Sequence, residues 1–282
     1  MANEEEAQDD GWNLNDYPDD IESLDLIHLK LKEIATLHLE RFIQLKILCL
    51  RQNQIDGFPH PSNLPLNLVE LDLRIEHLQH CSKLRNLYFV QNKISKIAGL
   101  DKLEALVSLE LGANRIRTIE NLENLVHLQE LWLGKNKITE LKGLKTLQNL
   151  RILSLQSNRL TSLDGLEALG DVLEELYVSH NGIISIQGLQ VLKRLRVLDI
   201  SNNKIEKLEY INQNTELQEL WASYNQLSDF ENVEKECKNM KKLVTIYLEG
   251  NPLQKANAPT YRNKIRLILP WIKQIDATCV QI

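Results

Sequence analysis

Residues 128–138 read LQELWLGKNKI, and the same frame recurs through most of the chain. Its general form is LxxLxLxxNx(I/L), which also fits LVSLELGANRI at 106–116 and LRILSLQSNRL at 150–160. The frame asparagines are spaced by 22 residues, with one spacing of 23, and they are Asn92, Asn114, Asn136, Asn158, Asn181, Asn203 and Asn225. Seven units at one period indicate a protein built from stacked repeats.

The frame predicts the structure of each repeat. The LxL core indicates a short strand, the asparagine marks a turn, and the rest of the unit returns as a helix or tight turns. One unit cannot bury its leucines alone, so neighbours stack around a shared core. We therefore predict an α/β leucine-rich-repeat solenoid with a curved parallel sheet on its concave face, short helices or 3-10 turns on its convex face, and capped ends. The asparagine amides satisfy backbone groups in the turns.

The repeat pattern divides the chain into three parts. Residues 1–20 are predicted to be an acidic disordered tail, 21–251 a repeat array of about eleven units, and 252–282 a C-terminal cap. The cap residues expected to cover the last strand are Tyr261, Ile265, Leu267, Ile268, Leu269 and Trp271. The LxL cores predict eleven strands, around Asp25, Cys49, Asp72, Tyr88, Glu110, Trp132, Ser154, Tyr177, Asp199, Trp221 and Tyr247.

One unit near 73–89 is truncated, because only 16 residues separate Leu73 from Phe89 and the turn asparagine is missing. We expect a tight or distorted turn there. The preceding loop contains Pro59, Pro61 and Pro65, which exclude a regular helix. Residues 56–76 are therefore predicted to be the weakest part of the array.

Composition indicates an intracellular protein. Of 282 residues 43% are hydrophobic and 5% aromatic, and no apolar run approaches the ~18–20 residues of a membrane span. The start, MANEEEAQDD, lacks the features of a signal peptide. The net charge is -6, but residues 1–20 hold eight acids and no Lys or Arg, which leaves 31 acids against 33 bases elsewhere. The four cysteines, Cys49, Cys81, Cys237 and Cys279, are far apart and expected to be reduced.

The residue between the two leucines of each LxL core points away from the core, onto the concave face. In the eleven strands this column contains five aromatic residues, four acids and no base. Strand propensity accounts for one or two of the aromatic residues but not for the acids. The column preceding it adds Glu130, Glu175 and Glu219. Rigid aromatic anchors with carboxylates predict a protein-binding surface that selects a basic or mixed partner.

The same face argues against nucleic acid as a partner, because phosphate binding requires clustered bases. Six bases flank the asparagines along one edge, and we interpret them as solvated: Arg115, Arg117, Lys135, Lys137, Arg159 and Lys204. The stretch HLQHC at 77–81 offers His77, His80 and Cys81, but Cys81 occupies a core position and no fourth metal ligand is evident. No Gly-rich phosphate loop or catalytic motif occurs, so we expect no cofactor, no metal, no membrane partner and no enzymatic activity.

Several stretches carry a more specific resemblance. LQSNRLT, YVSHNGI and YRNKIRLILPWIKQIDAT, together with the 22-residue frame, closely resemble the leucine-rich-repeat regulatory subunit of type-1 protein phosphatase, the regulatory subunit 7 family. The resemblance covers residues 22 to 282. It departs at the truncated unit, where relatives have one complete further repeat, and this puts Asp72 in doubt as a contact.

The resemblance implies a non-catalytic regulator of the phosphatase catalytic subunit, found in the nucleus and cytoplasm and linked to the cell cycle, often with a small inhibitor protein as third member. Its contacts, carried over by position, are Tyr88, Glu110, Trp132, Asp199, Glu219, Trp221 and Tyr247. The residue pattern adds Tyr177 to this predicted surface. The alternative is a structural scaffold in a ribonucleoprotein or cytoskeletal complex. Neither reading decides whether binding inhibits, matures or targets the phosphatase.

Overall fold

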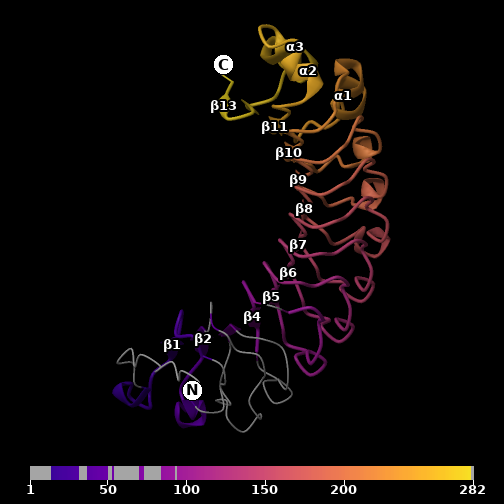
Figure 1. The fold of residues 1–282 in the computed structure, drawn as a ribbon. Helices are drawn as coiled ribbons and strands as arrows, with labels where there is room; N and C mark the ends of the chain where they lie inside the picture. Colours follow the sequence, from indigo (N-terminus) through magenta and orange to yellow (C-terminus); the bar gives the residue numbers. More distant parts are fainter. Residues whose placement is uncertain are drawn as a thin grey trace, which may run out of the picture.

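The structure, a computed structural model, describes residues 14–31, 37–49, 53, 70–72, 84–92 and 94–280, with only the backbone of 70–72. The described chain winds into a curved ribbon whose strands line the inner side (Figure 1). Short helices and turns form the outer side. The predicted leucine-rich-repeat solenoid is confirmed by this architecture.

The strands form one sheet in which each strand pairs with its neighbours in sequence. Strands β1 to β12 are parallel, and β13 is antiparallel to β12. Eleven of the thirteen strands coincide with the predicted LxL cores. The bounds are β1 (Ser23–Asp25), β2 (Ile47–Cys49), β3 (Glu70–Asp72), β4 (Asn86–Tyr88), β5 (Ser108–Glu110), β6 (Glu130–Trp132), β7 (Ile152–Ser154), β8 (Glu175–Tyr177), β9 (Val197–Asp199), β10 (Glu219–Trp221), β11 (Thr245–Tyr247), β12 (Gln274–Ile275) and β13 (Thr278–Cys279).

The register of the sheet aligns the leucines of successive repeats. Leu109 of β5 lies opposite Leu131 of β6, which lies opposite Leu153 of β7. All three are fully buried, as are the leucines that follow these three strands, Leu111, Leu133 and Leu155. Burying a leucine side chain stabilises a fold by about 1.5–3 kcal/mol. The stacked leucine columns therefore supply the main stabilisation of the array.

The frame asparagines join neighbouring repeats. Asn136 donates from Nδ2 to the Leu111 and Leu133 carbonyls at 2.9 and 3.0 Å, and its Oδ1 accepts from the Ile116 N–H at 3.0 Å. Asn114, Asn158, Asn181 and Asn203 make the equivalent bonds in their repeats. The predicted structural role of the asparagines is confirmed.

The convex side carries short helical segments in the return part of the repeats. They are the 3-10 helices η3 (Leu39–Arg41), η5 (Glu167–Leu169), η6 (Leu189–Val191) and η7 (Ile211–Gln213), and the α-helix α1 (Phe230–Cys237). The Asp229 side chain caps α1 by accepting from the Glu231 and Asn232 N–H groups. Each helical segment buries apolar residues against the leucine core, for example Leu169 in η5 and Val233 in α1.

The N-terminal end departs from the predicted tail in its last residues. Leu14 and Tyr17 pack against the core, and the 3-10 helix η1 (Leu14–Asp16) lies within this segment. The Arg41 guanidinium donates to the Leu14 and Tyr17 carbonyls at 2.6 and 3.1 Å. Residues 14–20 are thus held against the first repeats. Residues 1–13 lie outside the described part of the chain.

The truncated unit keeps its place in the sheet. Leu71 of β3 pairs with Leu87 of β4, and β3 also pairs with β2. The sheet is therefore continuous through this unit. The predicted distorted turn, the three prolines and HLQHC fall outside the described residues.

The C-terminal segment folds as α2 (Pro252–Lys255), α3 (Tyr261–Ile268) and the β12–β13 hairpin. It buries Tyr261, Ile265, Leu269 and Ile275 next to the last full repeat. Trp271 packs against the core and donates from Nε1 to the Met240 carbonyl at 3.1 Å. Leu267, expected among the covering residues, is instead 82% exposed, because it lies on the outer face of α3.

Candidate partner-binding surface

Each strand of the array presents two side chains on the concave face, because residues two apart in a strand point the same way. In β6 these residues are Glu130 and Trp132, with the buried Leu131 between them. The equivalent pairs are Glu175 and Tyr177 in β8, and Glu219 and Trp221 in β10. An acid followed by an aromatic residue therefore recurs on every second strand of this part of the sheet.

The aromatic residues of these strands touch one another across the sheet. The Trp132 and Tyr177 rings stack with their centroids 6.2 Å apart. Tyr177 meets Trp221 edge-on at 6.4 Å, and Trp221 meets Tyr247 of β11 edge-on at 6.0 Å. Such contacts stabilise by about 0.5–1.5 kcal/mol each beyond their buried area. We call Trp132, Tyr177, Trp221 and Tyr247 the aromatic ladder.

Two small or polar residues lie between the rings. Ser154 of β7 separates Trp132 from Tyr177, and Asp199 of β9 separates Tyr177 from Trp221. Ser154 is 2% exposed and Asp199 is 6% exposed, so the rings cover both. The Asp199 carboxylate accepts a hydrogen bond from the Ser201 N–H at 3.0 Å. These two positions let rings on alternate strands meet.

Carboxylates accept hydrogen bonds from the polar groups of two ladder rings. The Tyr177 hydroxyl donates to Glu175 at 2.7 Å, and the Trp132 Nε1 donates to Glu130 at 3.4 Å. The Ser108 hydroxyl also donates to Glu130, at 3.0 Å. Burial is the largest cause that raises the pKa of the Tyr177 hydroxyl, followed by its bond to Glu175 and neighbouring carboxylate charges. Tyr177 is therefore a neutral donor at physiological pH.

The last two rings of the ladder differ in their polar contacts. The Tyr247 hydroxyl accepts from the Gln274 side chain of β12 at 2.6 Å, which links the ladder to the C-terminal segment. The Trp221 Nε1 is buried and has no hydrogen-bond partner among the described residues. A buried, unpaired donor lowers stability by about 1–3 kcal/mol. The middle of the ladder is thus less satisfied than its end.

The predicted surface residues fall into three groups. Trp132, Tyr177, Trp221 and Tyr247 form the ladder, and Glu219 lies beside Trp221. Tyr88 and Glu110 lie on β4 and β5, in register with Trp132 of β6. Asp199 is the exception, because it is buried between neighbouring strands and offers a partner little surface. Sequence reasoning placed Glu130 and Glu175 in the neighbouring column but missed their bonds to the rings.

A second polar cluster lies at the edge where the strands begin. Arg151 donates to both oxygens of Glu174, at 3.1 and 2.9 Å, and Arg194 and Arg196 lie 3.5 and 3.7 Å from the same carboxylate. The bond from Arg151 is the largest cause that lowers the pKa of Glu174. The cluster borders a cavity of about 200 Å³ beside Glu130 and Glu175. All three arginines converge on one carboxylate, which favours a structural role.

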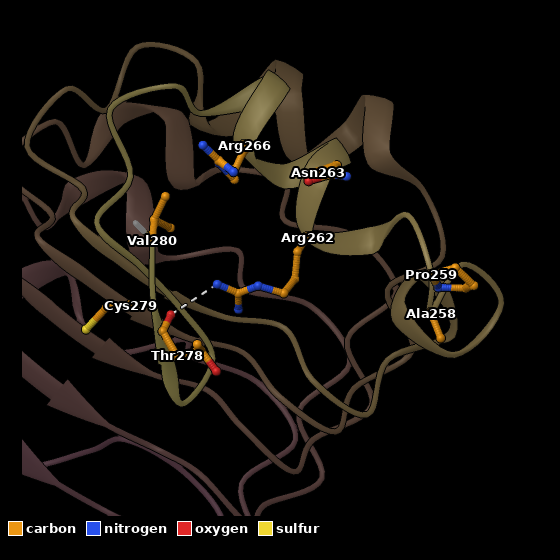
Figure 2. A pocket seen from close by; sticks show the side chains of 8 residues that line it. All are labelled: Ala258, Pro259, Arg262, Asn263, Arg266, Thr278, Cys279 and Val280. Carbon is orange, nitrogen blue, oxygen red and sulfur yellow. Dashed lines mark hydrogen bonds between the residues drawn. The ribbon is translucent and has the colours of Figure 1, made fainter. Parts of the chain in front are cut away.

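The C-terminal segment contains a larger pocket of about 420 Å³ between α3 and the β12–β13 hairpin (Figure 2). Arg262 crosses it and donates to the backbone carbonyl oxygens of Ile275 and Thr278 at 2.7 and 3.3 Å. Figure 2 shows this arginine reaching from the helix to the hairpin. These bonds fasten the hairpin to α3.

No group of three or more His, Cys, Asp or Glu within the described ranges has the geometry to hold a metal ion. No helix in those ranges has the length and apolarity to cross a membrane. Cys237 and Cys279 are free thiols, and Cys81 lies outside the described residues.

Comparison with known proteins supports the repeat assignment. The family model for leucine-rich repeats in two copies matches residues 82–124, 126–168 and 172–213. In solved structures, a leucine-rich-repeat protein of Leptospira interrogans is 28% identical with a TM-score of 0.63, covering 83% of this chain and 67% of that one. The functional domain of InlJ from Listeria monocytogenes has a TM-score of 0.64 at 20% identity, covering 90% and 62%. The latter likeness concerns the fold alone.

Individual curated proteins indicate a narrower group of relatives than the repeat family does. The chain is 55% identical over 73 residues to protein phosphatase 1 regulatory subunit SDS22 of Schizosaccharomyces pombe, which is 26% of this chain and 22% of that protein. It is 43% identical over 96 residues to the protein of the same name in Saccharomyces cerevisiae, 31% and 28% of the two chains. Human protein phosphatase 1 regulatory subunit 7 matches at 54% over 46 residues, 16% and 12%. The matches thus span less than a third of each relative.

Proposed function

We propose that this leucine-rich-repeat protein, a relative of phosphatase regulatory subunits, is a non-catalytic regulator that binds the catalytic subunit of type-1 Ser/Thr protein phosphatase through its concave face. The observation that carries the proposal is the aromatic ladder with its flanking carboxylates. The names of the curated relatives support the identity of the partner. The resemblance described above further suggests a place in the nucleus and cytoplasm, and a small inhibitor protein as a third member of the complex.

The ladder has the physical properties of a binding hot spot. Its rings are partly exposed and already packed against one another, so binding immobilises few side chains. Glu130, Glu175 and Glu219 give the face a negative charge. None of the outward-facing residues of β1 to β11 is Lys, Arg or His. A partner surface with basic residues around apolar ones would complement this face.

The test is direct binding of the purified chain to a purified type-1 catalytic subunit, followed by titration calorimetry on variants. Trp221→Ala and Glu219→Ala are expected to weaken binding, and loss of the central tryptophan should cost about 1–3 kcal/mol. Tyr210→Ala is the matched control, because Tyr210 is 39% exposed and precedes η7 on the convex side. It removes an aromatic ring without touching the ladder.

Two outcomes would overturn the proposal. The intact protein could fail to bind the catalytic subunit, which would favour the scaffold alternative. Trp221→Ala could bind as well as the intact protein, which would move the contact away from the ladder. If binding is observed, a phosphatase assay on the complex distinguishes inhibition from targeting without inhibition.

A further inference from the structure

The edge where the strands end carries a regular row of bases. The residue after each frame asparagine is Arg115, Lys137, Arg159 or Lys204 in four of five consecutive repeats, with Gly182 in the remaining one. Their backbone N–H groups bond to the carbonyl of the preceding repeat, at 2.7 Å for Arg115 and 2.8 Å for Lys137, Arg159 and Lys204. The backbone therefore holds this row in register.

The turns that carry these bases have a uniform shape. The residue before each asparagine is left-handed with φ between 54° and 56°, and the five residues are Ala113, Lys135, Ser157, His180 and Asn202. Neighbouring parallel strands lie roughly 4.8 Å apart, so the row from Arg115 to Lys204 extends over roughly 20 Å. Lys135 and Arg117 project from the same turns. We call these six bases the basic ridge.

The basic ridge is not neutralised by its surroundings. None of its six members makes an ion pair or a side-chain hydrogen bond within the described residues. Other surface bases do pair, as Lys142 does with Glu140 at 2.8 Å. The turn segments 112–117, 134–139, 156–161, 179–184 and 201–206 contain six bases and one acid, Glu206, a net charge of +5. The whole chain has a net charge of -6, so this charge is concentrated locally.

We propose that the basic ridge is a second binding surface, which takes an extended acidic segment of a polypeptide. Like charges on neighbouring turns repel one another, and a segment carrying several carboxylates relieves that repulsion. An extended chain rises about 3.3 Å per residue, so about six residues cover the ridge. This proposal is an alternative to interpreting these bases as solvated, and it does not depend on which protein binds the concave face.

A polypeptide fits this edge better than a nucleic acid. The ridge adjoins the concave face at the end where Glu110 finishes β5. A nucleic acid would bring a continuous row of phosphates next to that carboxylate. A narrow acidic peptide can follow the ridge with its carboxylates turned away from the acidic face.

The test is fluorescence anisotropy with a labelled oligoglutamate of about twelve residues, at about 0.05 M and 0.15 M salt. Binding is expected, and it should weaken with salt. The double variant Lys137→Glu and Arg159→Glu should weaken it about tenfold or more, because attraction becomes repulsion at the middle of the ridge. Gln226→Lys, which extends the row by one repeat, should strengthen binding a few-fold.

The matched control is the double variant Lys102→Glu and Lys145→Glu. It makes the same change of net charge at exposed positions in the return segments, and it should bind like the unaltered chain. Circular dichroism should show the same fold for all variants, because the substituted side chains are unpaired. Absence of oligoglutamate binding, or equal loss in both double variants, would overturn the proposal. Tighter ridge-dependent binding of a labelled oligothymidylate would also overturn it, in favour of a nucleic-acid site.

Discussion

Single side chains connect the repeats, and Asn136 is a representative example. Replacing it by alanine would leave the Ile116 N–H of the preceding repeat buried without a partner, and the Leu111 carbonyl would keep only its bond from Asn114. An unsatisfied buried group destabilises by about 1–3 kcal/mol and a lost hydrogen bond by about 1 kcal/mol, so we expect Asn136→Ala to lower the free energy of unfolding by about 2–4 kcal/mol. Urea unfolding followed by circular dichroism measures this change.

Asn149→Ala is the matched control for this substitution. Its side chain is exposed and donates one bond to the Val126 carbonyl at 2.8 Å. Water replaces that bond when it is lost, so the effect should stay below about 1 kcal/mol. Equal effects of the two substitutions would contradict the structural role of the frame asparagines.

The cysteines differ in chemistry because they differ in burial. Burial, with a smaller effect of the Glu236 carboxylate, raises the pKa of the Cys237 thiol to about 12. Cys279 is exposed on β13. We expect a maleimide at about pH 8 to modify Cys279 in the native protein and to spare Cys237 until the chain is unfolded. Peptide mass spectrometry resolves the two sites, and equal native labelling would refute the assignment.

For single residues, the sequence predicted which face of the sheet a side chain points to, but not which side chains pack against one another. The alternation of LxL fixes which side Trp132 and Asp199 point to, because it depends only on strand geometry. Whether two rings on alternate strands meet over the residue between them depends on side-chain rotamers and size. Asp199 therefore read as a contact residue in the sequence, whereas the rings of Tyr177 and Trp221 bury it.

At the scale of elements, the C-terminal segment fastens the end of the array through polar bonds as well as apolar packing. The buried Tyr261 hydroxyl of α3 donates to Asp276 at 2.9 Å. Burial, followed by the charge of Asp276, raises the pKa of Tyr261 above its ordinary value of 10.0. In the unfolded chain this tyrosine ionises near its ordinary pKa, while in the folded chain it stays protonated.

The stability contribution of Tyr261 should therefore be constant below about pH 10 and decline as the pH rises above it. Tyr261→Phe cannot ionise, so its unfolding free energy should fall less steeply over that range. At neutral pH the same variant should lose about 1 kcal/mol, because the bond to Asp276 is absent. Urea midpoints measured from pH 8 to 11 test both points. Tyr210→Phe, at an exposed site, is the control, and its urea midpoints should follow those of the unaltered chain. If the midpoints of Tyr261→Phe ran parallel to those of the unaltered chain over this pH range, the assigned pKa direction would be wrong.

Elements inside the regular array were predictable, and those at its ends were less so. The repeat frame located strands β1 to β11, because each LxL core has the same neighbours to pair with. The C-terminal segment has no repeat period, so the sequence indicated apolar coverage but not the β12–β13 hairpin. Leu267 shows the consequence, since an apolar residue in a helix can face outwards.

For the whole molecule, the consequence of stacking is that side chains far apart in sequence act together. Trp132 and Trp221 lie four strands apart, roughly 19 Å along the sheet, yet both contact the Tyr177 ring. Sites so distant are normally additive unless they share a partner. Removing either tryptophan frees the Tyr177 ring on one side, which should loosen the other half of the ladder.

We therefore expect Trp132→Ala and Trp221→Ala to be non-additive in binding the phosphatase catalytic subunit, with a coupling energy of about 0.5–1 kcal/mol. In a Tyr177→Ala background the coupling should fall below about 0.3 kcal/mol, because the connecting ring is gone. Calorimetric dissociation constants of the single and double variants provide both cycles. Trp132→Ala combined with Tyr210→Ala is the additive control. Additive losses with Tyr177 intact would mean that the rings bind as independent anchors, and that their contacts along the sheet do not contribute to recognition.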